Sequence, residues 1–353
     1  MSVSRISNVK ISGIASAVPE QTRTVLDDMI FFGEDKVSKI SRNIGVKSRH
    51  IAPAHLCTSD LCYFAAERLL SDAGWAKDSV DTLIFLSQTP DYKLPATSCV
   101  LQDRLGLSTD CAAFDINMGC SGYIYGLWVA SSLLSSGGAK RILLLVGDTV
   151  NKLVSKQDQS VALLFGDAGT ATLLESSSSA EEITFVLGTD GAGADNLIVP
   201  AGGFRSPSND STRIQMEKEN GTLRSDEELA MNGAEIFAFT LERVPKLINS
   251  VLSESNWTTD DVDFFIFHQA NKFMLDFLTK KMKLPAHKVL LNLEKFGNTS
   301  SASIPLALSD SLIEKMRIDK CKVILSGFGV GYSWGAVGLN MGPIIMPDVI
   351  SVQ

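Results

Sequence analysis

The sequence predicts an α/β fold made of two duplicated halves, each with helices packed on a mixed sheet. First, residues 70–85 match residues 252–267 without a gap, with eight identities in sixteen positions. Second, short apolar runs alternate with longer amphipathic segments along both halves. Third, 45% of the 353 residues are hydrophobic, which is ample for a large core. We therefore expect an N-terminal half at residues 1–175 and a C-terminal half at residues 176–353.

Both repeated windows have the pattern of a helix end, a turn and a buried strand. The strands expected from them span residues 81–86 and 263–267. Two further pairs of segments repeat in the same order: 141–146 with 322–325, and Gly119-Cys120-Ser121 with Gly297-Asn298-Thr299. Repeats that keep their order indicate duplication rather than chance.

Composition excludes several classes of protein. The formal net charge of −8 argues against nucleic acid as the main partner. Neither a signal-peptide pattern nor an apolar run long enough to span a membrane is present, so we expect a cytoplasmic protein without a membrane partner. The six cysteines have no zinc-site spacing, so we expect reduced thiols and no metal.

Cys120 lies where a strand is expected to give way to a helix. The run Ala112–Ile116 is suited to a buried strand, and apolar residues continue after Cys120 to Leu134, where Gly137-Gly138 closes the expected helix. Taken alone, the cysteine fits a small buried hydrophobe. The start of a helix also favours the thiolate, which is the nucleophilic form, so a reactive cysteine is the alternative.

Two polar residues of the second half occupy comparable places. His268 follows an apolar strand and precedes a helix expected over 272–282, although a core histidine would fit as well. Asn298 either caps a helix or faces a site. If the halves pack pseudo-symmetrically, their strand ends bring Cys120, His268 and Asn298 into one pocket. The run Gly327–Gly335 leads into no helix, so it is a poor dinucleotide fingerprint and fits a tight hairpin better.

Together these motifs resemble those of the β-ketoacyl-acyl carrier protein synthase III family, which has the thiolase-like fold. The resemblance runs from end to end and rests on five stretches in the family's order: 114–122, 165–169, 268–271, 297–300 and 328–335. It implies a homodimer whose subunits have a duplicated, five-layered α/β/α/β/α core. It also implies no cofactor and a decarboxylating Claisen condensation of an acyl group with malonyl-acyl carrier protein.

The resemblance implies a role for each motif residue. Cys120 would carry the acyl group, and His268 and Asn298 would hold the enolate oxygen formed by decarboxylation. The backbone N–H groups of Cys120 and Val330 would hold the second oxyanion. An asparagine at 298 favours decarboxylation, because a carboxylate there would repel the developing charge.

Further positions are assigned by the same resemblance. Phe165 and Leu94 would line the acyl pocket, with Leu94 reaching into a partner subunit. Lys272, Lys280 and Lys281 would dock the acidic acyl carrier protein, although a solvated helix face fits them equally well. The polar segment 203–228 is expected to be a mobile flap or a surface insertion.

The chain departs from the family where the primer's coenzyme A is usually clamped. Neither a tryptophan in 36–43 nor an arginine in 156–160 is present. The acyl thioester is therefore carried either by coenzyme A bound through other contacts or by a carrier protein. The setting is fatty-acid initiation or a specialised acyl pathway.

Three other functions remain open at this point. An acyltransferase of the same fold would pass the acyl group to oxygen or nitrogen. An inactive partner subunit is disfavoured because Cys120, His268 and Asn298 are all present. A hydride-transferring enzyme is disfavoured because the cofactor fingerprint is missing.

Overall fold

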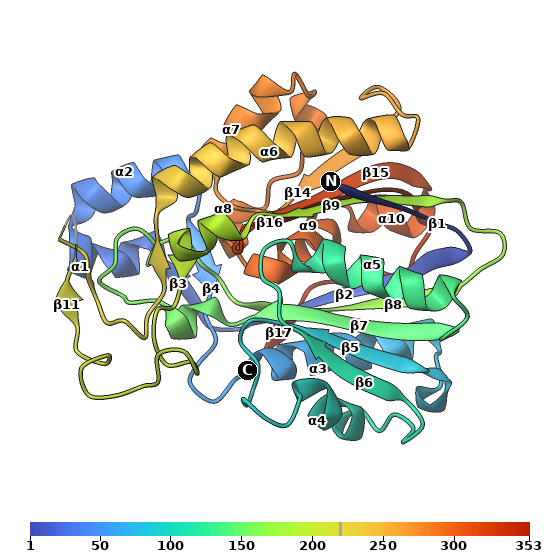
Figure 1. The fold of residues 1–353 in the computed structure, drawn as a ribbon, viewed down its shortest axis with the longest axis horizontal. Coiled ribbons are helices and arrows are strands. Elements are labelled where there is room, and N and C mark those ends of the chain that lie inside the picture. Colours follow the sequence, from blue (N-terminus) through green and yellow to red (C-terminus); the bar gives the residue numbers. More distant parts are fainter. Residues whose placement is uncertain (219–220) are drawn as a thin grey trace.

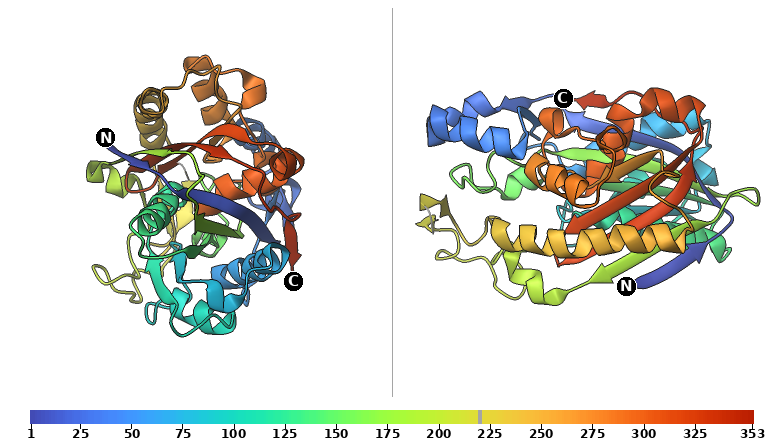
Figure 2. Two further views of the ribbon diagram at one scale, coloured as in Figure 1. Left: turned by 90° about the vertical axis from the view of Figure 1, so that its right-hand side faces the viewer. Right: turned by 90° about the horizontal axis from the view of Figure 1, so that it is seen from above.

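The computed structural model describes residues 1–218 and 221–353. Within that part of the chain, two large mixed sheets lie one above the other, with helices between them and on both outer faces (Figure 1). The side view in Figure 2 shows the resulting α/β/α/β/α layering. The five-layered, thiolase-like architecture expected from the sequence is therefore confirmed.

The described strands of the two large sheets follow one another in a characteristic order. The first sheet has the order β17 (Ile350–Val352), β2 (Val9–Pro19), β8 (Ala168–Ser176), β7 (Arg141–Asp148), β5 (Thr82–Leu86), β6 (Ala112–Ile116). The second has the order β1 (Ser2–Ile6), β9 (Ile183–Thr189), β16 (Ser333–Met341), β15 (Cys321–Gly329), β14 (Phe264–Phe267). In each sheet a central strand pairs in parallel on one side and antiparallel on the other: β7 with β5 and β8, and β15 with β14 and β16.

Helices form the remaining layers. The outer face of the first sheet is covered by α3 (Thr58–Ala73) and α4 (Thr97–Arg104). Between the sheets lie α5 (Gly122–Ser135) and α9 (Ser303–Ser311), and the second sheet is covered by α6 (Gly233–Glu254) and α7 (Lys272–Lys281). Further helices connect these elements: α1 (Met29–Phe32), α2 (Glu34–Ile44), α8 (Leu293–Phe296), α10 (Ile313–Ile318).

Three large clusters of buried apolar side chains lie between the layers in the described part of the chain, beside smaller clusters such as the one around Phe165. The largest includes Ile124 and Leu127 of α5 and Leu308 of α9, and it holds the two sheets together through the middle helices. The second cluster lies under α3, and the third under α6 and α7. Burial of these faces from water is the main stabilising contribution to the layered fold.

The two repeated sequence windows form equivalent elements in the structure. The first repeated window holds the end of α3 and strand β5, and the second holds the end of α6 and strand β14. The two terminal strands cross between the halves, since β1 joins the second sheet and β17 joins the first. The division between residues 175 and 176 falls near the end of β8 and stays a prediction.

The strand before Cys120 is less buried than the sequence suggests. Strand β6 lies at the edge of its sheet, and its residues are exposed or half-buried. The apolar residues of β6 therefore do not mean that both faces of this strand are covered by other elements. In the second half, the corresponding place holds a single parallel bridge between Phe265 and Val289, so Asn298 follows the short helix α8 and not a full strand.

A buried ion pair holds the segment that precedes α2 close to Ala162 and Gly297. Arg49 of β4 (Ser48–His50) and Asp28 are 1% and 2% exposed and form a salt bridge. Arg49 also donates to the carbonyl of Ala162, and its side chain packs against Gly297. The Gly297 backbone has φ +65° and no room for a Cβ atom, so the position requires glycine.

Removing the charge of Asp28 should be strongly destabilising. We expect Asp28→Asn to lower the free energy of unfolding by about 3–5 kcal/mol, because Arg49 would remain buried without its counter-ion. Chemical denaturation measures the change. Asp72→Asn, which breaks the exposed pair with Arg68, is the matched control and should cost less than about 1 kcal/mol. Equal losses in both variants would contradict this account of the buried pair.

The segment between β9 and α6 carries short strand pairs. Strand β10 (Leu197–Ile198) pairs with β13 (Ala230–Met231), and β11 (Met216–Glu217) pairs with β12 (Leu223–Arg224). Near the N-terminus, β3 (Thr22–Thr24) pairs with β4. The expected flap at 203–228 includes residues 219–220, which lie outside the described residues, and its mobility stays a prediction.

Candidate active site

Cys120 lies in a tight turn between β6 and α5. It is 6% exposed, and helix α5 begins two residues later at Gly122. Gly119 has no room for a side chain, since a Cβ atom there would approach Val330 Cγ1 to 2.6 Å. The turn can therefore fit under the β15–β16 hairpin only because a glycine precedes the cysteine.

The hairpin between β15 and β16 covers the nucleophile, as the glycine-rich run predicts. A Cβ atom on Gly329 would lie 2.9 Å from Cys120 Sγ, and one on Gly327 would lie 2.9 Å from the Cys120 carbonyl oxygen. The backbone N–H of Val330 is placed to donate a hydrogen bond to the sulfur. The hairpin thus supplies a hydrogen-bond donor at close range, which bulkier side chains would prevent.

His268 follows β14 directly, and its ring is fixed from two sides. Its backbone N–H donates to the Ser326 carbonyl of β15 at 2.8 Å, which continues the parallel ladder. Nδ1 lies 2.7 Å from the hydroxyl oxygen of Ser303, the first residue of α9. The ring packs edge-on against Phe328, with centroids 5.8 Å apart. Nδ1 is therefore occupied by Ser303, which leaves Nε2 for the other partners of the ring, the Ser300 backbone among them.

Asn298 is held between the two halves of the chain. Its N–H donates to the Leu164 carbonyl at 2.9 Å, and its own carbonyl accepts from Gly166 at 3.0 Å. The side-chain oxygen accepts from the Ser300 N–H at 2.9 Å, and Nδ2 lies 3.4 Å from the Ala270 carbonyl. An amide NH₂ has two hydrogens, so one remains for a substrate.

Ser300 joins the candidate residues. Its hydroxyl and its backbone lie close enough to the Cys120 thiol and the His268 ring to shift their pKa values, and its N–H donates to the Asn298 side-chain oxygen at 2.9 Å. It has φ +50°, a left-handed conformation that is uncommon for serine and that marks many functional sites. The structure thus brings Cys120, His268 and Asn298 together around one residue, from segments far apart in the sequence.

Asp148, at the end of β7, is a buried acidic residue beside the pocket that sequence reasoning missed. It is fully buried and accepts hydrogen bonds from Ser87 and the Gln88 N–H in the first half. In the second half, Ser301 donates to it through the hydroxyl at 2.6 Å and through the N–H at 3.3 Å. It therefore clamps the two halves beneath the site. Ordinary Ser and Asp residues of this kind give no sequence signal without tertiary contacts.

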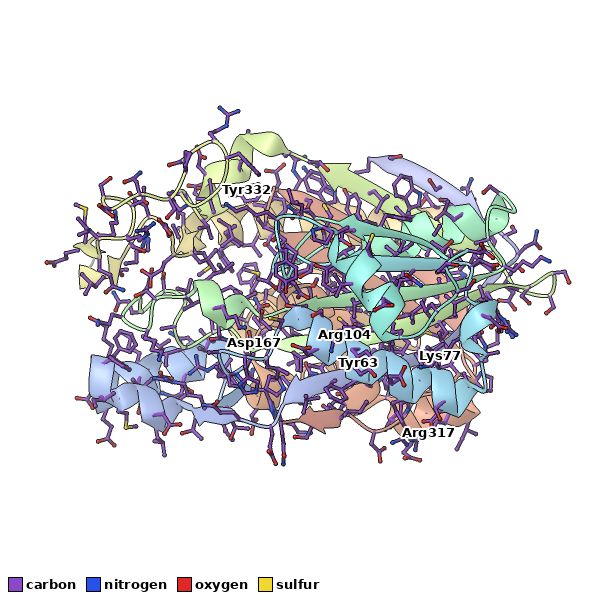
Figure 3. The ribbon with its side chains drawn as sticks, turned by 90° about the horizontal axis from the view of Figure 1, so that it is seen from below. Tyr63, Lys77, Arg104, Asp167, Arg317 and Tyr332 are labelled. Atoms are coloured by element: carbon purple, nitrogen blue, oxygen red, sulfur yellow. The ribbon has the colours of Figure 1, made fainter. Side chains whose placement is uncertain are left out.

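A second buried carboxylate organises the neighbouring loops. Asp167, labelled in Figure 3, accepts from the Ala52 N–H at 2.8 Å and from the Asn151 N–H at 3.1 Å. Burial raises the pKa of Asp167 to about 6. Asp167 ties the loop at Ala52 to the 3₁₀ helix at Asn151, and it does not line the pocket at Cys120.

The protonation states differ from the sequence-based expectation for the thiol. Burial raises the pKa of Cys120 to about 11, although the Val330 N–H and the Ser300 hydroxyl oppose the shift. Burial also lowers the pKa of His268 to about 3, so no imidazolium is present to favour a thiolate. Burial thus opposes the thiolate that the start of a helix favours, and it has the larger effect on the pKa of Cys120.

These pKa values predict how alkylation depends on pH. We expect the rate at which iodoacetamide modifies Cys120 to rise about tenfold per pH unit between pH 7 and 9, because the thiolate fraction does so below a pKa of about 11. Peptide mapping by mass spectrometry follows Cys120 separately from the other cysteines. A rate that is already constant at pH 7 would show that a thiolate is present and would contradict the shift.

An apolar pocket of about 820 Å³ extends from Cys120. Phe165, Ser300 and Val330 line it, and the roles expected for Phe165 in acyl binding and for the Val330 N–H at an oxyanion stay predictions. Leu94 does not line the pocket of its own chain and is 80% exposed.

The three lysines proposed for docking lie on α7, outside this pocket. Lys272 forms an ion pair with Asp276, and Lys281 donates to the Leu241 carbonyl at 2.8 Å. The Lys280 ammonium has no hydrogen-bond or ion-pair partner within 1–218 and 221–353, and the side chain is exposed. Lys280 is thus the best placed of the three to meet a partner's charge.

The part of the chain that the structure describes shows neither a metal cluster nor a membrane-spanning helix. No cluster of three or more His, Cys, Asp or Glu residues there could hold a metal ion. Among the same residues, no helix is long and apolar enough to cross a membrane.

Comparison with known proteins identifies the family. The family model "3-oxoacyl-[acyl-carrier-protein] synthase III" matches residues 114–191, and the model of that family's C-terminal region matches residues 252–341. A putative 3-oxoacyl-[acyl-carrier-protein] synthase 3 from Campylobacter jejuni is 37% identical, with 98% of each chain covered. The chain belongs to the 3-oxoacyl-acyl carrier protein synthase III family.

Solved structures agree with this membership. A 3-oxoacyl-(acyl-carrier protein) synthase from Burkholderia xenovorans is 45% identical and superimposes with a TM-score of 0.94, covering 99% of both chains. Synthase III from Pseudomonas aeruginosa is 30% identical with a TM-score of 0.81, covering 96% of this chain and 99% of that one. The synthase III fold therefore extends over nearly the whole chain.

Proposed function

We propose that this synthase III family member condenses a Cys120-bound acyl group with malonyl-acyl carrier protein, with loss of carbon dioxide. The observation that carries the proposal is the contact of Ser300 with Cys120, His268 and Asn298 at the wall of an apolar pocket. That arrangement joins a nucleophile to two neutral hydrogen-bond donors, which suits a reaction passing through an enolate.

In the first half-reaction, Cys120 Sγ attacks the carbonyl carbon of an acyl thioester. The bond from that carbon to the carrier's sulfur breaks, and the proton of the Cys120 thiol ends on the departing carrier thiol. The N–H groups of Cys120 and Val330 are placed to hold the tetrahedral oxyanion. Because the thiol has a raised pKa, acylation accelerates as the pH rises.

In the second half-reaction, malonyl-acyl carrier protein loses carbon dioxide, and the electron pair of the broken bond moves onto the thioester as an enolate. His268 Nε2–H and the free Asn298 N–H donate to the enolate oxygen. The Ser303 oxygen faces the Gln269 N–H at 3.4 Å, so its own hydrogen is available to Nδ1, which leaves the proton on Nε2. The enolate carbon then attacks the acyl carbonyl, and the Cys120 thiolate leaves.

The pKa of His268 gives this step a distinctive pH dependence. With a pKa of about 3, His268 is neutral from pH 5 to 8, so malonyl decarboxylation should show no histidine titration in that range. The chemistry needs neither metal nor cofactor, since the charge forms on an oxygen that N–H groups can hold.

The proposal includes an acyl carrier protein and a second copy of the chain as partners. Lys272, Lys280 and Lys281 give α7 a cationic face in a protein of net charge −8, which suits an acidic partner. Strand β6 ends its sheet with exposed residues, and pairing with a second β6 would cover that edge. We place this homodimer in the cytoplasm, with coenzyme A or a carrier protein delivering the acyl thioester.

Charge reversal tests the docking face. Lys280→Glu should raise KM for malonyl-acyl carrier protein several-fold and leave KM for a small malonyl thioester unchanged, because only the carrier protein contacts the helix. Steady-state kinetics with both substrates measures this difference. Lys140→Glu, at the start of β7 and remote from Cys120, is the control. Equal losses with both substrates would point to a structural role for Lys280.

The condensation itself is tested by its products. The protein, an acyl thioester and malonyl-acyl carrier protein should yield carbon dioxide and β-ketoacyl-acyl carrier protein in equal amounts. An acyltransferase of the same fold would instead consume the acyl thioester without releasing carbon dioxide, and that result would overturn the proposal.

A further inference from the structure

The pocket at Cys120 is much larger than a short acyl group requires. Its volume of about 820 Å³ lies in the upper part of the 300–1,000 Å³ range that is usual for sites of drug-sized ligands. An acetyl group on Cys120 would fill a small part of this space. The remainder would stay empty or take up water against apolar side chains, and neither arrangement contributes to binding.

The wall that follows Cys120 is apolar and comes from three separate segments. Val150 and Leu153 project from the 3₁₀ helix Val150–Leu153, Leu197 lies on β10, and Leu229 precedes β13. All four belong to one apolar cluster that includes Phe165. The Leu229 N–H donates to the Leu153 carbonyl at 2.7 Å, which fixes two of these segments together. The cluster offers a continuous surface to an extended hydrocarbon chain.

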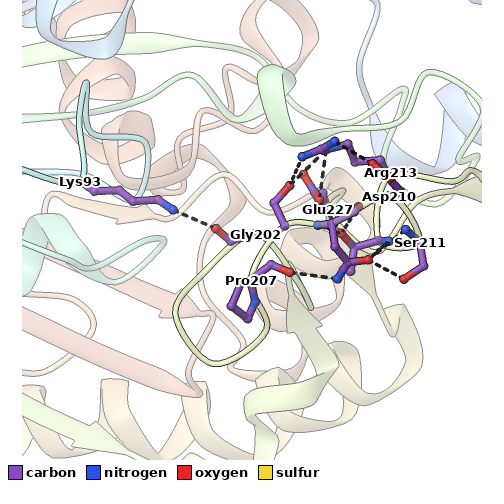
Figure 4. Close-up of polar contacts among 10 residues, drawn as sticks. Lys93, Gly202, Pro207, Asp210, Ser211, Arg213 and Glu227 are labelled. Carbon is purple, nitrogen blue, oxygen red and sulfur yellow. Dashed lines mark hydrogen bonds and ion pairs between the residues drawn. The ribbon is translucent and has the colours of Figure 1, made fainter.

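A polar part of the pocket lining, where Lys93 is exposed to solvent, marks the end of the apolar wall. Lys93 donates to the Gly202 carbonyl at 3.3 Å (Figure 4). The Lys93 ammonium also lies over the ring of Phe204. Glu227 also lines this end, where it accepts from Thr212 at 2.6 Å. An acyl chain long enough to reach Lys93 and Glu227 would place its methyl end beside charged groups. Further methylene groups would then add no favourable binding free energy.

We propose that the acyl group taken by Cys120 is a medium-chain saturated acyl group and not acetyl. The inference rests on the proposed function, in which Cys120 carries the acyl group, and it adds the substrate class. The apolar cluster around Phe165 binds the hydrocarbon part of the acyl group. Lys93 and Glu227 set the upper limit on the length of that chain. Leu94 of a second copy would add apolar surface to the same pocket.

A series of thioesters tests the chain length. Acetyl, butanoyl, hexanoyl, octanoyl and decanoyl pantetheine are incubated with the protein, and intact-protein mass spectrometry gives the rate of Cys120 acylation. Pantetheine avoids any dependence on coenzyme A contacts. We expect the rate to rise about three- to fourfold per added methylene, up to hexanoyl or octanoyl, and then to level off or fall. A rate that is highest with acetyl, or equal for all donors, would overturn the inference.

Substitutions in the apolar wall test whether the pocket determines the preferred length of the acyl chain. Leu153→Phe and Leu197→Phe each add volume to the apolar wall and should lower octanoyl transfer more than about tenfold, with a smaller loss for butanoyl. Two positions keep the test valid if one variant folds poorly. Ile318→Phe, on the exposed end of α10 and 71% exposed, should keep the original order of donors. An unchanged order in both wall variants would contradict the assignment.

The outcomes separate this inference from the proposed function. If acetyl is transferred to Cys120 and longer groups are not, the condensing activity stands and only the substrate class is wrong. If no donor acylates Cys120, while the fold is intact by circular dichroism, the proposed function fails.

Discussion

Replacing Cys120 with alanine is expected to abolish the covalent acyl-enzyme while decarboxylation of malonyl-acyl carrier protein remains measurable. The sulfur is the atom that takes the acyl group, whereas His268 and Asn298 supply the donors for the enolate. Intact-protein mass spectrometry after incubation with an acyl thioester measures the adduct, and release of carbon dioxide measures decarboxylation. The adduct should fall below detection in Cys120→Ala.

The exposed Cys99 provides the matched control for this variant. Cys99→Ala removes a thiol that is freely accessible and lies outside the pocket. It should keep the full acyl adduct and full condensation. If the adduct instead persists in Cys120→Ala and disappears in Cys99→Ala, Cys120 is not the nucleophile.

Replacing Asn298 with alanine is expected to give the opposite result. Loss of one donor to the enolate oxygen should reduce decarboxylation by about 100- to 1,000-fold, while acylation of Cys120 continues. His268→Ala should act in the same way, because His268 is neutral and serves as a donor through Nε2. Separate assays of acylation and carbon dioxide release distinguish the two half-reactions.

Asn298→Asp sharpens this second test. The substitution keeps the size of the side chain and removes its N–H donor, and a carboxylate would repel the enolate. Decarboxylation should fall at least as far as in Asn298→Ala. A fall in both half-reactions by the same factor would indicate that Asn298 only supports the local fold, through its contacts with Leu164 and Gly166.

Much of the architecture could be predicted from the sequence because duplication leaves a readable pattern. The repeated helix, turn and strand at 70–85 and 252–267 fixes equivalent positions in the two halves. Polar residues at strand ends then point to one shared site. That reasoning places Cys120, His268 and Asn298 near one another, as the contacts of Ser300 do in the structure.

Other features of the site depend on tertiary structure that no local pattern reveals. Asp148, Ser300 and Ser303 are ordinary polar residues until burial brings them beneath the pocket. The sequence shows that Cys120 lies at the start of a helix, a position that favours the thiolate form. The desolvation that raises its pKa comes from burial in the fold, to which the distant hairpin around Gly329 contributes.

The pocket wall was predictable only in part for the same reason. Phe165 lies in a motif that the sequence displays, whereas Leu153, Leu197 and Leu229 belong to segments without a recognisable pattern. Their contact is created by the β10–β13 pair and the backbone bond from Leu229 to Leu153. The length of the acyl chain that the pocket accepts can therefore be inferred only from the three-dimensional structure.

A pulse-chase experiment followed by intact-protein mass spectrometry tests the central claim most directly. The protein is acylated, freed of excess thioester and then mixed with malonyl-acyl carrier protein. The account predicts an adduct on Cys120 that disappears on mixing, with an equal amount of β-ketoacyl-acyl carrier protein and carbon dioxide formed. An adduct on another residue, or one on Cys120 that survives while carbon dioxide is released, would contradict it.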